Sequence, residues 1–317
     1  MKYKPQFQDE TIYALKLVSF LKGTLDRREL DVISACCMTE SKYVVRVYNW
    51  WYEIDPKFDK YCILMELCET NLASYIHKRY VEQKSHLNEP EIWAIICNIM
   101  EGIQRCHELN FTHRDIKPQN SNVHFEMRLT LVLYSAKTKT WKLTDFGIAA
   151  KLPASVPAMA ITGLPTPPGT PTGQLLPIPP PGSNISLTKR GSPGYVAPEL
   201  LYSGICSRKG DIWSIGCVLY ELACGRMAFP QPEAQVFGAQ AFQDPLRNYY
   251  CGQGEPPEVA KTDNQKIMEI AGKNYFGGPV SGRYRINQVI SWCLERDSNE
   301  RPKIGRLVCH VKSIVFQ

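Results

Sequence analysis

Three short motifs, in a fixed order along the chain, limit what this 317-residue sequence can fold into. They are residues 113–120 (His-Arg-Asp-Ile-Lys-Pro-Gln-Asn), 145–147 (Asp-Phe-Gly) and 197–199 (Ala-Pro-Glu). Together they supply a carboxylate that can accept a proton, a lysine that can face a phosphate, and two oxygen ligands for magnesium. A phosphoryl transfer from ATP to a hydroxyl requires these groups.

Composition indicates an ordinary globular protein. Hydrophobic residues make up 44% of the chain and charged residues 21%, and the net charge of +6 is mild for this length. The first ten residues are polar, and no apolar run reaches the roughly 18 residues of a membrane span. We therefore expect an intracellular protein, cytoplasmic or nuclear, with no nucleic-acid and no membrane partner.

The twelve cysteines are scattered, and none of them are paired at the spacing of zinc ligands. Cys217, Cys224 and Cys293 lie in apolar runs of helical character. This pattern predicts buried free thiols in a reducing compartment.

Hydrophobic patterning predicts a small β-rich part followed by a mostly helical part. Segments 12–18, 43–52 and 61–67 are β-rich apolar runs, and segment 25–36 has helical spacing. After residue 88 the signals are helical, and they include apolar runs at 211–223 and 286–294.

A helix is predicted to begin next to residue 88. Asn88 and Glu91, with Pro90 between them, match a capping box. Isoleucines then recur on one helical face, at positions 92, 95, 96, 99 and 103. We expect this face to be buried.

Segment 153–181 interrupts the pattern with ten prolines in 29 residues. Such a composition can neither fill an apolar core nor sustain a strand ladder, so we expect a disordered or polyproline-like segment. Its P-x-x-P spacings could dock in the aromatic groove of an SH3- or WW-type partner. The alternative is a flexible insert without a partner.

From about Ala14 to about Arg301, the chain resembles the eukaryotic protein kinase superfamily. The resemblance implies an α+β protein with the two-lobed protein kinase fold. Residues 1–67 would form a truncated β-rich lobe, and residues 68–317 a larger helical lobe. Segments 121–131 and 152–187 would be inserts in the second lobe, the latter within the activation segment.

In this interpretation Asp115 orients the substrate hydroxyl and accepts its proton, and Lys117 neutralises charge on the transferring phosphoryl group. A lysine at that position goes with serine/threonine kinases in the family. Asn120 and Asp145 would hold Mg²⁺ through oxygen atoms. The alternative is a solvated loop unrelated to catalysis.

The family's Ala-x-Lys pattern on a strand matches Ala14 and Lys16. By resemblance, Lys16 would bind the α- and β-phosphates of ATP. Glu29 is the best candidate for its helical partner, and Asp26 and Asp31 lie nearby as alternatives.

Residues 65–68 resemble the connection between the lobes. There the backbone of Glu66 and Cys68 would hydrogen-bond adenine, with Met65 at the back of the pocket. Leu133 would form the floor under adenine if segment 121–131 is set aside. Apolar packing is the alternative interpretation of residues 65–68.

Two features depart from the family pattern. No glycine occurs before Gly23, so the Gly-rich loop that covers the phosphates is missing ahead of Lys16. We expect either a truncated chain or weak nucleotide binding.

Segment 121–131 is the second departure. It separates Asn120 from the strand that should follow it, either as a real loop or as a mistaken exon boundary.

Three further residues have architectural roles by resemblance. Glu199 would form a buried ion pair with Arg301. Asp211 would cap the catalytic loop from a central helix.

Arg114 marks the kinases whose activation segment is ordered by phosphorylation. Thr188 stands where that phosphate is usually placed, four residues before Ser192. Ser192 itself would face the catalytic loop.

The predicted function is ATP- and Mg²⁺-dependent phosphorylation of serine or threonine in protein substrates. One alternative is a pseudokinase scaffold that binds nucleotide weakly because the Gly-rich loop is absent. A weaker alternative is a proline-rich adaptor with an incidental helical domain. The intact motif residues favour the enzyme, and the missing loop favours the scaffold.

Overall fold

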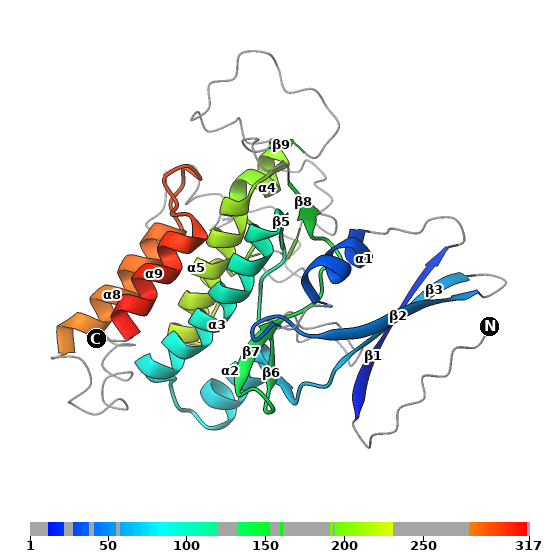
Figure 1. Ribbon diagram of the computed structural model, residues 1–317. Coiled ribbons are helices and arrows are strands. Elements are labelled where there is room, and N and C mark those ends of the chain that lie inside the picture. The colour runs from blue at the N-terminus through cyan, green and yellow to red at the C-terminus, as the bar shows by residue number, and fades with distance from the viewer. Residues whose placement is uncertain are drawn as a thin grey trace, which may run out of the picture.

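The computed structural model separates into a small region built on a β-sheet and a larger region of helices (Figure 1). The structure describes residues 12–21, 28–37, 41–54, 58–118, 132–152, 159–160, 191–192, 194–230 and 279–315. Among these residues, no helix is long and apolar enough to cross a membrane. The described cysteines are all free and most of them are buried, as the sequence predicts.

Three antiparallel strands form the sheet region. They are β1 (Tyr13–Leu21), β2 (Val47–Ile54) and β3 (Phe58–Glu66). Their order is β1-β3-β2, so β3 is hydrogen-bonded on both sides. The three predicted strands are present, but the second begins at Val47 rather than near residue 43. The reason is that Val44 pairs instead with Leu143, in the other region.

Between β1 and β2 the chain forms a short helix, α1 (Arg28–Val32), which is labelled in Figure 1. One π-helical turn, η1 (Ile33–Cys37), follows it directly. Leu30 and Ile33 are buried, which confirms the predicted apolar face. The regular α-helix ends earlier than expected, because the backbone widens to the π form from Ile33 onward.

Short strands flank the first two motifs or pair with the strands that do. They are β4 (Thr70–Asn71), β5 (Phe111–Thr112), β6 (Val132–Ser135), β7 (Thr140–Leu143) and β8 (Ala150–Lys151). β4, β6 and β7 form one small sheet, and β5 pairs with β8. Residues 113–118 directly follow β5, and residues 144–147 directly follow β7. The strand predicted after segment 121–131 does begin at Val132; the segment itself and Asn120 lie outside the described residues.

Helices form the larger region. They are α2 (Leu72–His77), η2 (Lys78–Glu82, a π-helical turn), α3 (Glu89–Glu108), α4 (Pro198–Ser203), α5 (Arg208–Cys224), α8 (Pro279–Cys293) and α9 (Ile304–Val315). α5 packs between α3 and α8, and α9 packs along α3 (Figure 1). Every residue of α5 from Asp211 to Ala223 is buried, so α5 is the central helix of this region.

The predicted start of α3 is confirmed. The Asn88 side chain accepts a hydrogen bond from the Glu91 N–H, and the Glu91 carboxylate accepts one from the Asn88 N–H, both at 2.9 Å. These two bonds satisfy backbone donors that have no partner within the helix. The isoleucines at 92, 95, 96, 99 and 103 are all buried, as their spacing predicts.

The described part of the proline-rich stretch departs from the predicted lack of strand pairing. Met159 and Ala160 form a strand, β9 (Met159–Ala160), which pairs antiparallel with β10 (Ile205–Cys206). Both residues have the backbone N–H that proline lacks, so they can take part in a ladder. The P-x-x-P spacings and Thr188 lie outside the described residues, and the SH3- or WW-type partner stays a prediction.

Gly102 on α3 allows the close approach of two other segments. A Cβ atom there would lie 2.7 Å from Leu143 Cδ1 and 2.7 Å from the Tyr43 carbonyl oxygen. That carbonyl accepts a hydrogen bond from the Leu143 N–H at 2.9 Å. The residues that precede β2 are thus hydrogen-bonded to the strand that leads to Asp145, directly over α3.

We predict that Gly102→Ala destabilises the protein by about 1–3 kcal/mol, because the added methyl group overpacks this junction. The free energy of unfolding, measured by chemical denaturation, checks this. Gly305→Ala is the matched control, since a Cβ on Gly305 of α9 meets nothing within 4 Å. The control should be neutral or slightly stabilising. An equal effect of both changes would contradict the prediction.

Candidate active site

The Lys16 ammonium joins three separate parts of the chain. Lys16 Nζ, on β1, lies 2.5 Å from Glu29 Oε1 on α1 and 2.9 Å from Asp145 Oδ1 after β7. Burial alone would lower the pKa of Lys16, but the carboxylates of Asp145 and Glu29 outweigh it and raise the pKa. The structure therefore selects Glu29 over Asp31, which is exposed on α1. Asp26 lies outside the described residues.

Two motif residues have a left-handed backbone. The φ angle is +59° at Asp145 and +71° at Arg114. Residues other than glycine rarely adopt this conformation, and they do so where the surrounding structure holds them. At Asp145, the Gly147 N–H donates to Oδ1 (3.4 Å), the atom that also contacts Lys16.

Asp115, Lys117 and Ser192 form a second cluster. The Ser192 hydroxyl donates a hydrogen bond to Asp115 Oδ1 at 2.6 Å. Lys117 Nζ contacts the same hydroxyl and lies 3.4 Å from Asp115 Oδ2. The carboxylate and the ammonium are each 18% exposed, so both can be reached from solvent. Ser192 therefore contacts the loop that follows β5.

Asp211 on α5 holds the backbone that leads to Asp115. Its fully buried carboxylate accepts hydrogen bonds from the N–H groups of His113 (2.9 Å) and Arg114 (2.8 Å). The Thr112 hydroxyl and His107 Nε2 each lie 2.8 Å from Oδ2. Burial alone would raise the pKa of Asp211, but the contact with His107 and the other donors lowers it.

His107 and Thr112 are not among the residues predicted from the sequence. They lie 104 and 99 residues from Asp211, on α3 and β5. No local pattern marks either residue, because their role appears only when the three elements pack together.

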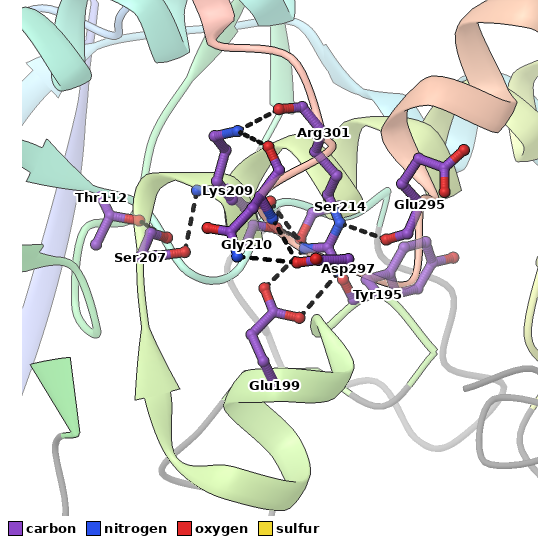
Figure 2. Close-up of polar contacts among 11 residues, drawn as sticks. Thr112, Tyr195, Glu199, Ser207, Lys209, Gly210, Ser214, Glu295, Asp297 and Arg301 are labelled. Atoms are coloured by element: carbon purple, nitrogen blue, oxygen red, sulfur yellow. Dashed lines mark hydrogen bonds and ion pairs between the residues drawn. The ribbon is translucent and has the colours of Figure 1, made fainter. Parts of the chain in front are cut away.

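Arg301 and Glu199, the first residue after Pro198 in α4, form a buried ion pair (Figure 2). The guanidinium makes two hydrogen bonds to the carboxylate, at 2.7 and 3.0 Å, and its Nε donates to the Glu295 carbonyl at 2.8 Å. It also lies over the Trp213 ring at 4.9 Å. Lys209 of α5 donates to the carbonyl oxygen of Arg301. This pair ties α4 to α5 and to the segment between α8 and α9.

Another buried ion pair joins the last residue of β3 to β7. Lys142 Nζ on β7 lies 2.7 Å from Glu66 Oε1, and the Glu66 N–H donates to the Arg46 carbonyl at 2.9 Å. The N–H of Glu66 is thus occupied, so a contact from Glu66 to adenine would use its carbonyl oxygen. Met65 is buried and pairs across the strands with Ala14.

Cys68 and Leu133 are half-buried and pack against the core. Burial and the nearby Glu66 carboxylate raise the pKa of Cys68 to about 12, so its thiol is not a nucleophile at neutral pH. Leu133 lies on β6, opposite Asn71 and Lys142 of the adjoining strands.

Arg114, the neighbour of Asp115, is buried, and its Nε has no hydrogen-bond partner among the described residues. It lies against Cys206; burial raises the pKa of that thiol to about 11, although Arg114 opposes the shift. Thr188, the expected phosphorylation site, lies outside the described residues. The partner predicted for Arg114 therefore stays a prediction.

A buried carboxyl group supports the segment before α4. The Tyr195 hydroxyl donates to Glu221 on α5, and the Tyr195 carbonyl accepts a hydrogen bond from the Ser214 hydroxyl at 2.8 Å. Burial raises the pKa of Glu221 to about 7. This contact was not predicted from the sequence.

Comparison with known proteins decides the family. The model of the protein kinase domain matches residues 6–311 of the chain. The chain belongs to the protein kinase domain family. It therefore has the α+β, two-lobed fold of that family, with the sheet region as the smaller lobe and the helical region as the larger lobe of the kinase domain.

Individual kinases are similar at low identity. Mitosis inhibitor protein kinase wee1 of Schizosaccharomyces pombe is 24% identical over 247 residues, or 77% of this chain and 22% of the relative. The probable serine/threonine-protein kinase nek2 of Dictyostelium discoideum is 26% identical over 270 residues, or 84% and 47%. MAP kinase kinase skh1/pek1 of Schizosaccharomyces pombe is 28% identical over 309 residues, or 95% and 66%. The chain spans less than two thirds of the length of each of these relatives.

We predict that the stability of the kinase domain depends on pH through Glu221. Its pKa is about 7 in the folded protein against an ordinary 4.5, so between these values the folded protein keeps a proton that the unfolded chain loses. The free energy of unfolding therefore falls as pH rises through this window, by up to roughly 3 kcal/mol.

Glu221→Gln removes this titration while keeping an oxygen for Tyr195. The free energy of unfolding of the variant, relative to the parent, should rise between pH 4.5 and pH 8 and then level off. Chemical denaturation of both proteins at a series of pH values measures this difference in the free energy of unfolding. The contributions of other titrating groups are the same in both proteins and cancel in the difference. A difference that does not change with pH would contradict the assignment.

Proposed function

We propose that this kinase domain transfers the γ-phosphoryl group of Mg-ATP to serine or threonine hydroxyls of proteins. The observation that carries the proposal is the Lys16 ammonium, which two carboxylates from distant segments hold in one place. A fixed cation of this kind can bind the phosphate oxygens of a nucleotide. Membership of the kinase family supports ATP as that nucleotide.

Asp115 is proposed as the catalytic base. Its carboxylate already accepts a hydrogen bond from one serine hydroxyl, that of Ser192, at 2.6 Å. A substrate hydroxyl bound to the carboxylate would lose its proton to Asp115 as its oxygen bonds to the γ-phosphorus. The bond between that phosphorus and the departing ADP oxygen breaks in the same transfer. Lys117, beside the same carboxylate, would offset negative charge on the phosphoryl group.

Asp145 would hold Mg²⁺ together with Asn120, which lies outside the described residues. Carboxylate and amide oxygens are ligands that Mg²⁺ prefers, and the Asp145 side chain is 22% exposed, so these residues fit the ion. The ion would supply positive charge that offsets the charge of the nucleotide phosphates.

The adenine contacts are proposed to come from the carbonyl of Glu66 and the backbone of Cys68, with Met65, Ala14 and Leu133 as the apolar surroundings. Ala14 and Met65 are register partners on β1 and β3, which supports a shared wall. Serine or threonine specificity rests on Lys117, whose position goes with that class, and on the similarity to serine/threonine kinases.

A scaffold that binds nucleotide weakly is the alternative function. It would keep the fold and lack phosphoryl transfer, so a transfer assay separates the two proposals.

We predict that purified protein with Mg-ATP phosphorylates a generic basic protein on serine or threonine, and that Asp115→Asn lowers the rate by roughly 100-fold or more. Labelled γ-phosphate and analysis of the phosphorylated amino acids measure both points. Asp31→Asn, an exposed carboxylate on α1, is the matched control and should match the parent. If Asp115→Asn labels the substrate as fast as the parent at equal thermal stability, the role of Asp115 is wrong.

A further inference from the structure

Tyr61 on β3 lies outside the three sequence motifs, yet its hydroxyl forms a hydrogen bond with the partner of Lys16. Its hydroxyl donates to Glu29 Oε2, the carboxylate oxygen that does not contact Lys16. The tyrosine is 1% exposed. It pairs with Val18 of β1 and Tyr52 of β2, so its backbone is fixed on both sides.

The Glu29 carboxylate is thus divided between two donors. Oε1 faces Lys16 at 2.5 Å, and Oε2 faces Tyr61. The Glu29 side chain is only 8% exposed, so water cannot readily replace a lost donor. With both oxygens occupied, rotation of the carboxylate would break two contacts at once.

The helix that carries Glu29 cannot fix it alone. α1 has five residues and Glu29 is the second of them, and the π-helical turn follows directly. Helices this short depend on tertiary contacts for their stability. The tyrosine hydroxyl supplies such a contact to the carboxylate itself, from the central strand of the sheet.

Lys16 has a second carboxylate within reach. Asp145 Oδ1 lies 2.9 Å from the ammonium, on the side of the larger lobe. If Glu29 is displaced, the ammonium remains paired with Asp145 and is free to follow it. The position of Lys16 relative to the sheet therefore depends on how firmly Glu29 is held.

We propose that Tyr61 is a positioning residue for phosphate binding: it fixes the Glu29 carboxylate and, through it, the Lys16 ammonium. This rests on the proposed function of Lys16. Tyr61 does not touch the nucleotide in this account. Its loss therefore acts on the step that needs Lys16, and contacts with the protein substrate are unaffected.

The test is Tyr61→Phe, which removes one oxygen and keeps the ring. A hydrogen bond to a charged group is lost, so kcat/KM for ATP should fall about tenfold or more. KM for the protein substrate should stay within twofold. Tyr52→Phe is the matched control, since Tyr52 is the cross-strand neighbour and is 40% exposed. It should leave both constants unchanged.

A double-mutant cycle with Glu29→Ala shows whether Tyr61 acts through Glu29. In the Glu29→Ala background, Tyr61→Phe should lower kcat/KM for ATP by less than twofold. Full, independent effects of the two changes would overturn the proposal, as would a Tyr61→Phe variant that matches the parent.

The two proposals fail in different ways. A parent protein that transfers no phosphate overturns the proposed function, and the same cycle is then measured as Mg-ATP affinity by calorimetry. A parent that transfers phosphate while Tyr61→Phe does so equally well overturns only the role of Tyr61. A parent that neither transfers phosphate nor binds Mg-ATP overturns both.

Discussion

The contact of one ammonium with two carboxylates, Lys16 with Glu29 and Asp145, fixes how the two lobes of this kinase domain meet. The three groups come from β1, α1 and the loop after β7, and each is largely buried. Losing a partner of a buried charge is destabilising, so moving α1 or the loop after β7 away from β1 costs one of the two ion contacts of Lys16. The Glu66–Lys142 pair and the junction over Gly102 hold the same lobe boundary at two other points.

A second constraint lies beneath the loop that carries Asp115. The buried carboxylate of Asp211 accepts the two backbone N–H groups that precede Asp115, so the loop takes its shape from the central helix α5. The same helix supports the segment after Ser192 through Glu221 and receives Arg301 through Lys209. Buried side chains of α5 therefore hold both the backbone that leads to Asp115 and the segment after Ser192.

Much of this arrangement could be predicted from local sequence. The capping box at Asn88, the isoleucine face of α3 and the three motifs are patterns within a few residues. From the resemblance Glu29 is the preferred partner of Lys16, with Asp26 and Asp31 as alternatives. The structure decides between Glu29 and Asp31, because the Glu29 carboxylate contacts Lys16 and Asp31 is exposed. Tyr61 and His107 were missed because their partners are 32 and 104 residues away. Pairing of Met159–Ala160 with β10 is likewise a tertiary contact, which composition alone does not predict.

The most direct test of this account is the affinity of the protein for Mg-ATP, measured by calorimetry for the parent and for Lys16→Met. The account predicts saturable binding by the parent and a loss of about tenfold or more in the variant, since a charge-assisted contact to phosphate disappears. Lys151→Met, an exposed lysine after the second motif, serves as the control and should bind like the parent. Equal affinities of the parent and Lys16→Met, with both proteins folded, would contradict the account.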